Sequence, residues 1–119
     1  MKTSGKFVIQ KHIRGKDIHW DLMLEAGEAL DTHRLTLPPE KLTKETSPAV
    51  KISEHQLKFL TYEGPVNQGR GNVEIADSGT YHVICREPDH TELELTGQIL
   101  KGRFILSRTA DDEWQFGPV

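Results

Sequence analysis

Two histidines and one aspartate near the start of the chain have the types and spacing of a metal-binding group. His19 and Asp21 are separated by one residue, and His12 ends a separate strand-like run at 7–12. Side chains alternate between the two faces of a strand, so His19 and Asp21 are expected on one face. If the run at 7–12 pairs with the run at 18–25, His12 completes a site of two imidazoles and one carboxylate.

This donor set leaves coordination positions open and suits a divalent transition metal such as Mn²⁺, Zn²⁺ or Fe²⁺. A bound ion would polarise a phosphoryl oxygen or activate water, and either route assists the cleavage of a phosphate ester. The same three groups could instead hydrogen-bond one another on a solvated sheet face, because a His-x-Asp pair often arises by chance. The residues alone leave both interpretations open.

A further imidazole, His55, follows Glu54 at a predicted corner between two strands. From there it could reach the metal-binding face and donate a proton to a leaving oxygen or steady a phosphate. The spacing fits an exposed loop histidine equally well. His33 lies on the strand that follows Asp21 and could also approach the site.

The elements that must hold these side chains have the two-residue period that is typical of β-strands. Residues 40–46 could form one short helix, and turns are expected at 77–79 and 101–102. Many short strands at close spacing predict a mainly β protein, a single compact antiparallel β-barrel with short loops and at most one or two short helices. The expected strands are 7–12, 18–25, 29–35, 49–53, 57–62, 72–76, 80–86, 91–100, 103–108 and 114–116.

The length of the chain favours one domain with one core. At 119 residues the chain can bury most of its apolar surface, and we expect a single domain over residues 1–119. Trp20, Leu22 and Leu24 alternate with the proposed ligands and are therefore expected in that core. Cys85 is the single cysteine, which excludes an intramolecular disulfide, and a small buried hydrophobe is its simplest role.

The charge balance argues against a protein that coats DNA, because the formal net charge is −3. The hydrophobic content of 35% fits a soluble globular protein. No apolar run approaches the roughly 20 residues that span a bilayer, and no signal-peptide stretch is evident, so a cytoplasmic location is expected. A local basic rim could still serve an enzyme acting at a strand end, although an ordinary solvated face explains it more simply. The rim would comprise Lys2, Lys6, Lys11, Arg14 and Lys16.

The order of the motifs resembles the 3′-phosphoesterase domain of bacterial ligase D. The runs FVIQKH at 7–12 and HWDLMLE at 19–25 resemble the family opening F-V-x-Q-K-H, a short spacer, then H-Y-D-L-R-L-E. The likeness covers nearly the whole chain, in order and with similar spacing. Further motifs that resemble those of the family are Glu54-His55, Tyr62-Glu63-Gly64, residues 69–73, residues 77–81, residues 97–109 and Trp114.

This resemblance implies a compact β-barrel with a Mn²⁺-dependent site on its concave surface. The family trims 3′ ends of DNA, removing a terminal ribonucleoside and then the 3′-phosphate. By match, His12, His19 and Asp21 would bind the metal, and His55 would contact the scissile phosphate, with Glu54 beside it as the second catalytic residue. The expected partners are DNA 3′ ends and separate ligase or polymerase repair proteins, with the chain acting as a monomer and without a membrane.

The chain departs from the family pattern where the phosphate would be clamped. Met23 stands where the family usually has an arginine, whose fork matches a phosphate bidentately. Leu37 lies in the region of a usual lysine, and Ser47 and Phe59 stand where a second arginine and a tyrosine are usual. Each lost donor typically lowers the rate on the order of a hundredfold.

Other cations could replace the missing clamp, and the candidates are Arg14, Arg34, Lys51 and Arg70. Three functions therefore stay open at this point. The chain could be a metal-dependent phosphoesterase for nucleic-acid ends, a non-catalytic module that binds DNA or a repair partner, or a phosphoesterase with a substrate other than DNA. A retained metal-binding group favours the two enzymatic functions.

Overall fold

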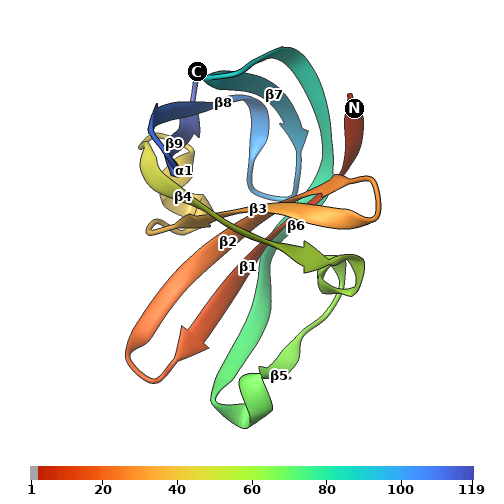
Figure 1. The fold of residues 1–119 in the computed structure, drawn as a ribbon, viewed down its shortest axis with the longest axis vertical. Coiled ribbons are helices and arrows are strands. Elements are labelled where there is room, and N and C mark those ends of the chain that lie inside the picture. Colours follow the sequence, from red (N-terminus) through yellow and green to blue (C-terminus); the bar gives the residue numbers. More distant parts are fainter. Residues whose placement is uncertain (1–2) are drawn as a thin grey trace.

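The polypeptide folds almost entirely into strands (Figure 1). The computed structural model describes residues 3–119, and Lys2 of the predicted basic rim lies outside them. In chain order the elements are β1 (Ser4–Arg14), β2 (Asp17–Ala26), β3 (Ala29–Leu35), α1 (Pro39–Leu42), β4 (Ser47–Gln56), the 3₁₀ turn η1 (Leu57–Leu60), β5 (Gly64–Val66), the 3₁₀ turn η2 (Asn67–Gly69), β6 (Gly71–Glu87), β7 (His90–Thr96), β8 (Lys101–Ala110) and β9 (Glu113–Pro118).

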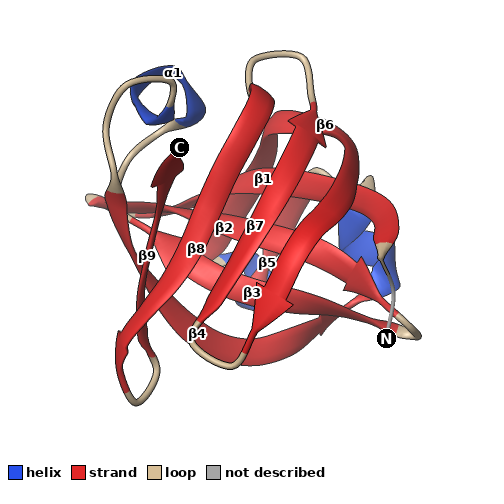
Figure 2. Cartoon of the chain, turned by 90° about the horizontal axis from the view of Figure 1, so that it is seen from above, coloured by secondary structure: helices blue, strands red, loops and turns tan. Residues whose placement is uncertain are grey.

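The strands of the described residues form one sheet that closes on itself (Figure 2). Their order is β1-β2-β3-β4-β9-β8-β7-β6-β5, and a further pairing of β1 with β6 completes the ring, while the short strand β5 pairs with the start of β6. Neighbouring strands are antiparallel throughout. A closed ring has no free edges within it, which protects it from edge-to-edge association. The predicted mainly β, antiparallel barrel is confirmed.

The hairpins that carry the candidate ligands turn at glycines. Gly15, between β1 and β2, has φ +60°, and Gly27, between β2 and β3, has φ +68°. Other residues adopt this left-handed conformation only with steric strain, so glycine makes both tight turns possible. The two turns fix the registers of β1, β2 and β3, and with them the face on which each side chain lies.

Three predicted elements were wrong. The expected strand at 57–62 begins with the 3₁₀ turn η1, in which Phe59 and its neighbour Leu60 both pack on one apolar cluster. Strand alternation would have sent these two side chains to opposite faces. The expected turn at 77–79 lies inside the continuous strand β6, and the chain reverses at 97–100 rather than at 101–102.

Asp77 and Gly79, which suggested a turn, instead allow β6 to approach the chain between β7 and β8. Asp77 is buried, and its carboxylate accepts hydrogen bonds from the backbone N–H groups of Gln98 and Leu100 at 2.7 and 2.8 Å. A Cβ atom on Gly79 would lie 1.9 Å from the Thr96 carbonyl oxygen. Glycine is therefore required here by close backbone contact rather than by a turn.

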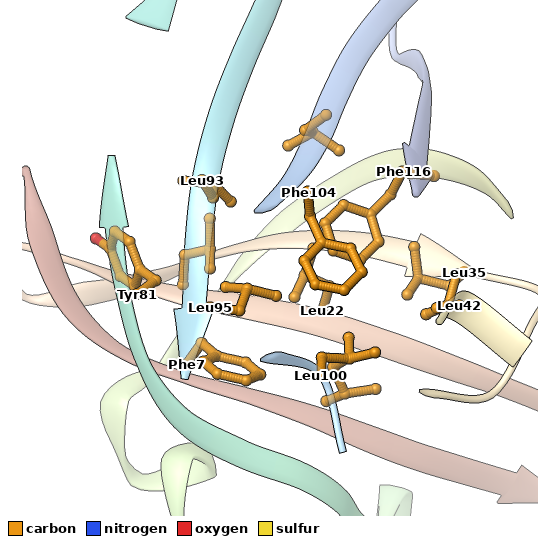
Figure 3. Close-up of a cluster of buried hydrophobic side chains, with 14 residues drawn as sticks. Phe7, Leu22, Leu35, Leu42, Tyr81, Leu93, Leu95, Leu100, Phe104 and Phe116 are labelled. Carbon is orange, nitrogen blue, oxygen red and sulfur yellow. The ribbon is translucent and has the colours of Figure 1, made fainter. Parts of the chain in front are cut away.

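The main core fills the interior of the ring (Figure 3). Phe104 and Phe116 stack within it, with ring centroids 5.5 Å apart. Leu22 and Leu24 belong to this core and Trp20 packs against it, as expected from the alternation on β2. The buried members are Phe7, Ile9, Leu22, Leu24, Leu35, Leu42, Ala49, Tyr81, Leu93, Leu95, Leu100, Phe104, Leu106 and Phe116.

A second, smaller apolar cluster lies on the opposite face of β1 and β2. Val8 and Met23 pair across these two strands and are buried with Leu30 of β3. Phe59, Leu60 and Ile75 pack against them. The candidate metal-binding residues share this face, so the cluster forms the surroundings of the site. Among the described residues, no helix has the length and apolar character needed to cross a membrane.

Candidate metal centre

The β1–β2 hairpin brings His12, His19 and Asp21 together on one face. His12 lies directly opposite His19 in the register, and Gln10 lies directly opposite Asp21. Directly opposed side chains on one face of a sheet are neighbours. His12 Nδ1 lies 3.0 Å from His19 Nε2, and His19 Nε2 lies 3.7 Å from Asp21 Oδ1. The three prospective ligand atoms all lie within 4.8 Å of one another.

The polar atoms of this group lack the partners that buried atoms normally have. Asp21 is 3% exposed, yet its Oδ1 accepts no hydrogen bond, and Nε2 of His12 is likewise buried without a partner. Such atoms carry a free-energy penalty unless something satisfies them. A divalent cation would satisfy the carboxylate oxygen, and two imidazole nitrogens with one carboxylate are a donor set for Mn²⁺, Zn²⁺ or Fe²⁺. The residues present therefore fit a metal ion.

The electrostatics of the site keep His19 available as a ligand. Burial lowers the pKa of His19 below its usual value of 6.5. The Asp21 carboxylate opposes this shift, whereas Arg34 and His12 reinforce it. His19 is therefore neutral at physiological pH, and a histidine must be neutral to bind a metal because coordination uses the nitrogen lone pair.

A cavity of about 110 Å³ lies over the group, and His55 stands in its wall. The ring of His55 packs edge-on against Phe59, with centroids 5.8 Å apart, and its Nδ1 lies 3.1 Å from the Ser53 carbonyl oxygen. The corner at the end of β4 thus directs His55 towards the site. Glu54 is exposed on the same strand and does not line the cavity. The lining residues are Gln10, His12, Asp21, His55, Phe59, Val66, Asn67 and Val73.

The segment from η1 to β5 is held over the cavity by two polar contacts. Gln10, which is 2% exposed, donates from Nε2 to the Tyr62 carbonyl oxygen at 3.1 Å. Glu63 accepts through Oε2 from the backbone N–H of Ile75 at 2.9 Å, beside the irregularity in the β1–β6 pairing. The Tyr62-Glu63-Gly64 motif therefore anchors the segment between Phe59 and Val66, two residues that line the cavity.

Gly71 supports His12 from behind. A Cβ atom at this position would lie 2.8 Å from His12 Nε2, which is too close for the ring to keep its place. Gly71 opens β6, where the next residues pair with the end of β1. The glycine in the 69–73 motif thus lets the imidazole pack against the strand, a positioning role.

Of the cations expected to replace the phosphate clamp, the structure brings one to the ligands. Arg34 lies opposite Asp21 in the β2–β3 register, and its Nε is 3.6 Å from Asp21 Oδ1. Lys51 instead forms an ion pair with Asp31 and lines a separate cavity. The other two candidates are exposed, Arg14 at the end of β1 and Arg70 immediately after η2.

The positions that depart from the family pattern have taken structural roles. Met23 is fully buried in the small apolar cluster, and Phe59 packs against the same cluster. Both departures therefore belong to one apolar cluster beside the site, of which Phe59 lines the cavity and Met23 does not. Ser47 is buried, and its hydroxyl accepts from the Thr36 backbone N–H at 3.0 Å, while Leu37 packs against the main core.

Sequence reasoning missed part of the cavity wall and misplaced one histidine. Val66, Asn67 and Val73 line the cavity but lie in stretches expected to be a loop or a plain strand. Asn67 has φ +53°, an uncommon value outside glycine that marks a special position only once the structure is known. His33 does not approach the site, because it lies on the opposite face of β3 from its neighbour Arg34.

Comparison with known proteins agrees with this geometry. Residues 10–108 match the family model of the DNA ligase D 3′-phosphoesterase domain. The chain is also 28% identical over 112 residues to the multifunctional non-homologous end joining protein LigD of Pseudomonas aeruginosa. That match covers 87% of this chain and 13% of the relative's length. The family match spans most of the chain and contains the three candidate ligands and every residue that lines the cavity, and the chain belongs to the DNA ligase D 3′-phosphoesterase domain family.

Proposed function

We propose that the protein is a metal-dependent phosphoesterase that removes 3′-phosphates and 3′-terminal ribonucleosides from DNA ends. The observation that carries the proposal is the group formed by His12, His19 and Asp21, of which His12 and Asp21 line one cavity and each have a buried polar atom without a hydrogen-bond partner. Membership of the phosphoesterase family supports the reaction class. The relative named for end joining supports a place in the repair of DNA breaks.

The three ligand residues would hold a divalent ion, Mn²⁺ by family resemblance, which supplies Lewis-acid stabilisation of a phosphoryl oxygen when bound. His55 lines the same cavity, where its imidazole can donate a proton to a leaving oxygen or hydrogen-bond a phosphate. Glu54 is exposed outside the cavity wall, so we assign it no contact with the substrate.

Arg34 is the cation best placed to bind a phosphate at this site. Its side chain is 45% exposed, so the part that does not face Asp21 remains accessible to a substrate. A guanidinium can bridge a carboxylate and a phosphate because it has five N–H donors. We assign it the part of the charge stabilisation that the arginine expected at the Met23 position would otherwise supply.

The apolar cluster beside the cavity favours a second candidate, a phosphoesterase that acts on a substrate other than DNA. Met23 and Phe59 stand where the family usually has an arginine and a tyrosine, and both pack in this cluster. A net charge of −3 also lowers the non-specific attraction to a polyanion. The same ligands would serve this reaction, so the two candidates differ in the body of the substrate and not in the metal chemistry.

The test is an end-processing assay with matched variants. A primer–template that ends in a 3′-phosphate or a single 3′-ribonucleotide is incubated with the protein, with and without Mn²⁺. The Asp21→Ala variant removes a ligand, and Asp17→Ala, at an exposed position at the start of β2, is the control. We expect Mn²⁺-dependent trimming that is lost in the first variant and kept in the second.

Calorimetry with Mn²⁺ on the same variants separates the remaining outcomes. Metal binding without trimming of either end, together with hydrolysis of a small phosphate ester, would replace the DNA proposal by the second candidate. Metal binding without any hydrolysis would leave a binding module. Failure to bind metal would overturn the proposal at its first step.

A further inference from the structure

The hairpin loop between β5 and β6 has a backbone conformation that favours glycine but carries two other residues in it. The strand pairing on either side leaves residues 67–70 as the loop, which contains η2. Asn67 and Gln68 have φ +53° and +59°. Elsewhere among the described residues, Asp111 alone has a positive φ without being a glycine. Such a conformation is uncommon for residues with a side chain, and strained positions of this kind cluster at functional sites.

Asn67 lies where this loop meets the metal-binding cavity. Asn67 and the preceding residue Val66 line the cavity, whereas Gln68 does not. Val66 pairs with Gly71, the residue that lies directly behind the ring of His12. The base of the loop is therefore fixed beside a candidate ligand, and the exposed Asn67 stands at the rim of the cavity.

The side-chain amide of Asn67 has no structural role within the described residues. The backbone carbonyl of Asn67 accepts from the Arg70 N–H at 3.1 Å, which closes the turn, but the side chain forms no hydrogen bond with any described residue. Asparagine in a turn often hydrogen-bonds to its own backbone, and here it does not. An amide without an internal partner, at a position that glycine would occupy with less strain, indicates an external partner.

The other polar side chains that line the cavity are already engaged. The two candidate ligands among them would bind the metal, and the amide nitrogen of Gln10 donates to a backbone carbonyl. His55 donates from Nδ1 to the Ser53 carbonyl oxygen, because a carbonyl only accepts, and this leaves an acceptor at Nε2 of the neutral ring. Asn67 therefore supplies the uncommitted neutral donor at the rim.

We propose that the side-chain amide of Asn67 donates a hydrogen bond to a phosphoryl oxygen of the substrate, an inference that rests on the proposed phosphoesterase function. The cavity of about 110 Å³ has roughly the space of four water molecules, which suits a phosphoryl group and excludes a sugar or a base. Phosphoryl oxygens are strong acceptors, and a hydrogen bond to a charged acceptor is stronger than one between neutral groups. The amide thus adds a neutral donor to the charge that Arg34 supplies.

Glycine substitutions at two neighbouring positions separate the amide from the turn. Asn67→Gly removes the amide, and Gln68→Gly relieves the same kind of strain outside the cavity. Glycine adopts a positive φ without steric cost, so both variants should keep or raise the melting temperature. In the presence of Mn²⁺, Asn67→Gly should lower kcat/KM about tenfold for both a 3′-phosphate end and a 3′-ribonucleotide end. Gln68→Gly should leave kcat/KM unchanged.

A binding measurement tests the contact without relying on DNA trimming. Phenylphosphonate carries a phosphoryl group that is not hydrolysed, and it is titrated onto the Zn²⁺-loaded protein while the ¹⁵N–¹H signals of the Asn67 side-chain amide are followed. We expect saturable shifts, and about tenfold weaker phosphonate binding in Asn67→Gly but not in Gln68→Gly. If the unsubstituted protein shows these shifts and trims neither DNA end, the DNA substrate is wrong and the contact of Asn67 with a phosphoryl group stands.

The assignment of Asn67 fails under any of three results. Amide signals that do not respond to phosphonate, or an unchanged phosphonate affinity in Asn67→Gly, would show that the amide does not contact a phosphoryl group. A loss of kcat/KM confined to the 3′-ribonucleotide end would assign the amide to the 2′-hydroxyl group of the sugar. A fall in the melting temperature of Asn67→Gly would show that the side chain stabilises the turn.

Discussion

Two aspartates, Asp21 and Asp77, are almost equally buried, at 3% and 2% exposure, but have opposite surroundings. The Asp77 carboxylate accepts four backbone hydrogen bonds, at 2.7 to 3.1 Å. Asp21 Oδ1 accepts none, and its nearest charged groups are His19 at 3.7 Å and Arg34 at 3.6 Å. Both lie in stretches that resemble motifs of the family. The difference separates a carboxylate that holds the fold together from one whose Oδ1 has no hydrogen-bond partner.

Burial alone therefore does not identify a functional carboxylate. A buried charge is stable only when it is hydrogen-bonded, paired or bound to a metal. Asp77 meets that condition inside the protein, where it organises the reversal between β7 and β8. Asp21 meets it only through long contacts, at 3.6 Å to Arg34 Nε and 3.7 Å to His19 Nε2, and its Oδ1 accepts no hydrogen bond, so an additional cation is the simplest completion of its surroundings. The predictions below test this contrast, beginning with the largest expected effect.

Replacement of Asp77 by alanine should cause the largest loss of stability. Four backbone donors would lose a charged acceptor, and those of Ile99 and Leu100 lie in partly or fully buried surroundings. We expect the free energy of unfolding to fall by roughly 3–5 kcal/mol. Urea denaturation of metal-free protein measures it. A loss below about 1 kcal/mol would show that Asp77 is no more structural than Asp21.

A third buried group, His33, should make stability depend on pH. Burial lowers its pKa to about 4 in the folded protein, against an ordinary value of 6.5 for a histidine side chain. The unfolded chain therefore takes up a proton between these values and the folded protein does not. The contribution of neutral His33 to the free energy of unfolding is fully present above pH 6.5. It is lost as the pH falls towards 4, by at most roughly 3 kcal/mol.

Carboxylates titrate in the same range, so the measurement is the difference between the protein and its His33→Leu variant. The charged groups that face His33 are Asp31, Lys51 and Arg86, and all three are kept in the variant. In urea denaturation at a series of pH values, the free energy of unfolding should fall more steeply with decreasing pH for the unmodified protein than for the variant. Parallel curves would mean that His33 takes up a proton as readily in the folded protein as in the unfolded chain.

A methyl group at Gly71 should weaken metal binding without unfolding the protein. The added Cβ would meet His12 Nε2 at 2.8 Å and displace the ring from its neighbours. Disturbing the support of a ligand typically lowers metal affinity about tenfold or more. Calorimetric titration with Mn²⁺ measures this, with Asn72→Ala as the neighbouring control on β6. Equal affinity for Mn²⁺ in the Gly71→Ala and Asn72→Ala variants would show that Gly71 does not position His12.

The smallest effect on stability is expected at Asp21 itself. Asp21→Asn keeps the shape of the side chain and breaks no hydrogen bond at Oδ1, so the metal-free protein should change by less than about 1 kcal/mol. The same variant should lose Mn²⁺ binding, because a charged ligand becomes neutral. If Asp21→Asn destabilised the metal-free protein as much as Asp77→Ala, the contrast between the two carboxylates would be lost.

The sequence predicted what depends on local periodicity. Alternation along 19–25 separated the face of His19 and Asp21 from the face of Leu22 and Leu24, and the short turn at Gly15 set the pairing that brings His12 to the same place. These relations involve neighbouring strands and short loops. The barrel and the family were predicted from the same pattern and from the order of the motifs.

What the sequence did not predict depends on contacts between distant segments. The η1 turn forms because Phe59 and Leu60 pack on Val8 and Met23, far away in the chain. Asp77 looked like a turn residue because its hydrogen-bond donors lie about twenty positions later, at 98–100. No local rule relates such partners, and tertiary packing overrides the local preference.

Arg34 and His33 are neighbours on β3 and lie on opposite faces of the sheet, so this strand separates the candidate metal centre from the cavity beside His33. Arg34 faces the metal centre, and His33 faces that separate cavity of about 160 Å³. A one-residue deletion near the start of β3 could preserve the backbone hydrogen bonds to β2 and β4. It would nevertheless move every later side chain of β3 to the opposite face of the sheet. The surroundings of the candidate metal centre and of the cavity beside His33 would both change in a single step, although no side chain had been substituted. Insertions and deletions in β3 should therefore be tolerated far less than point substitutions at Arg34 or His33.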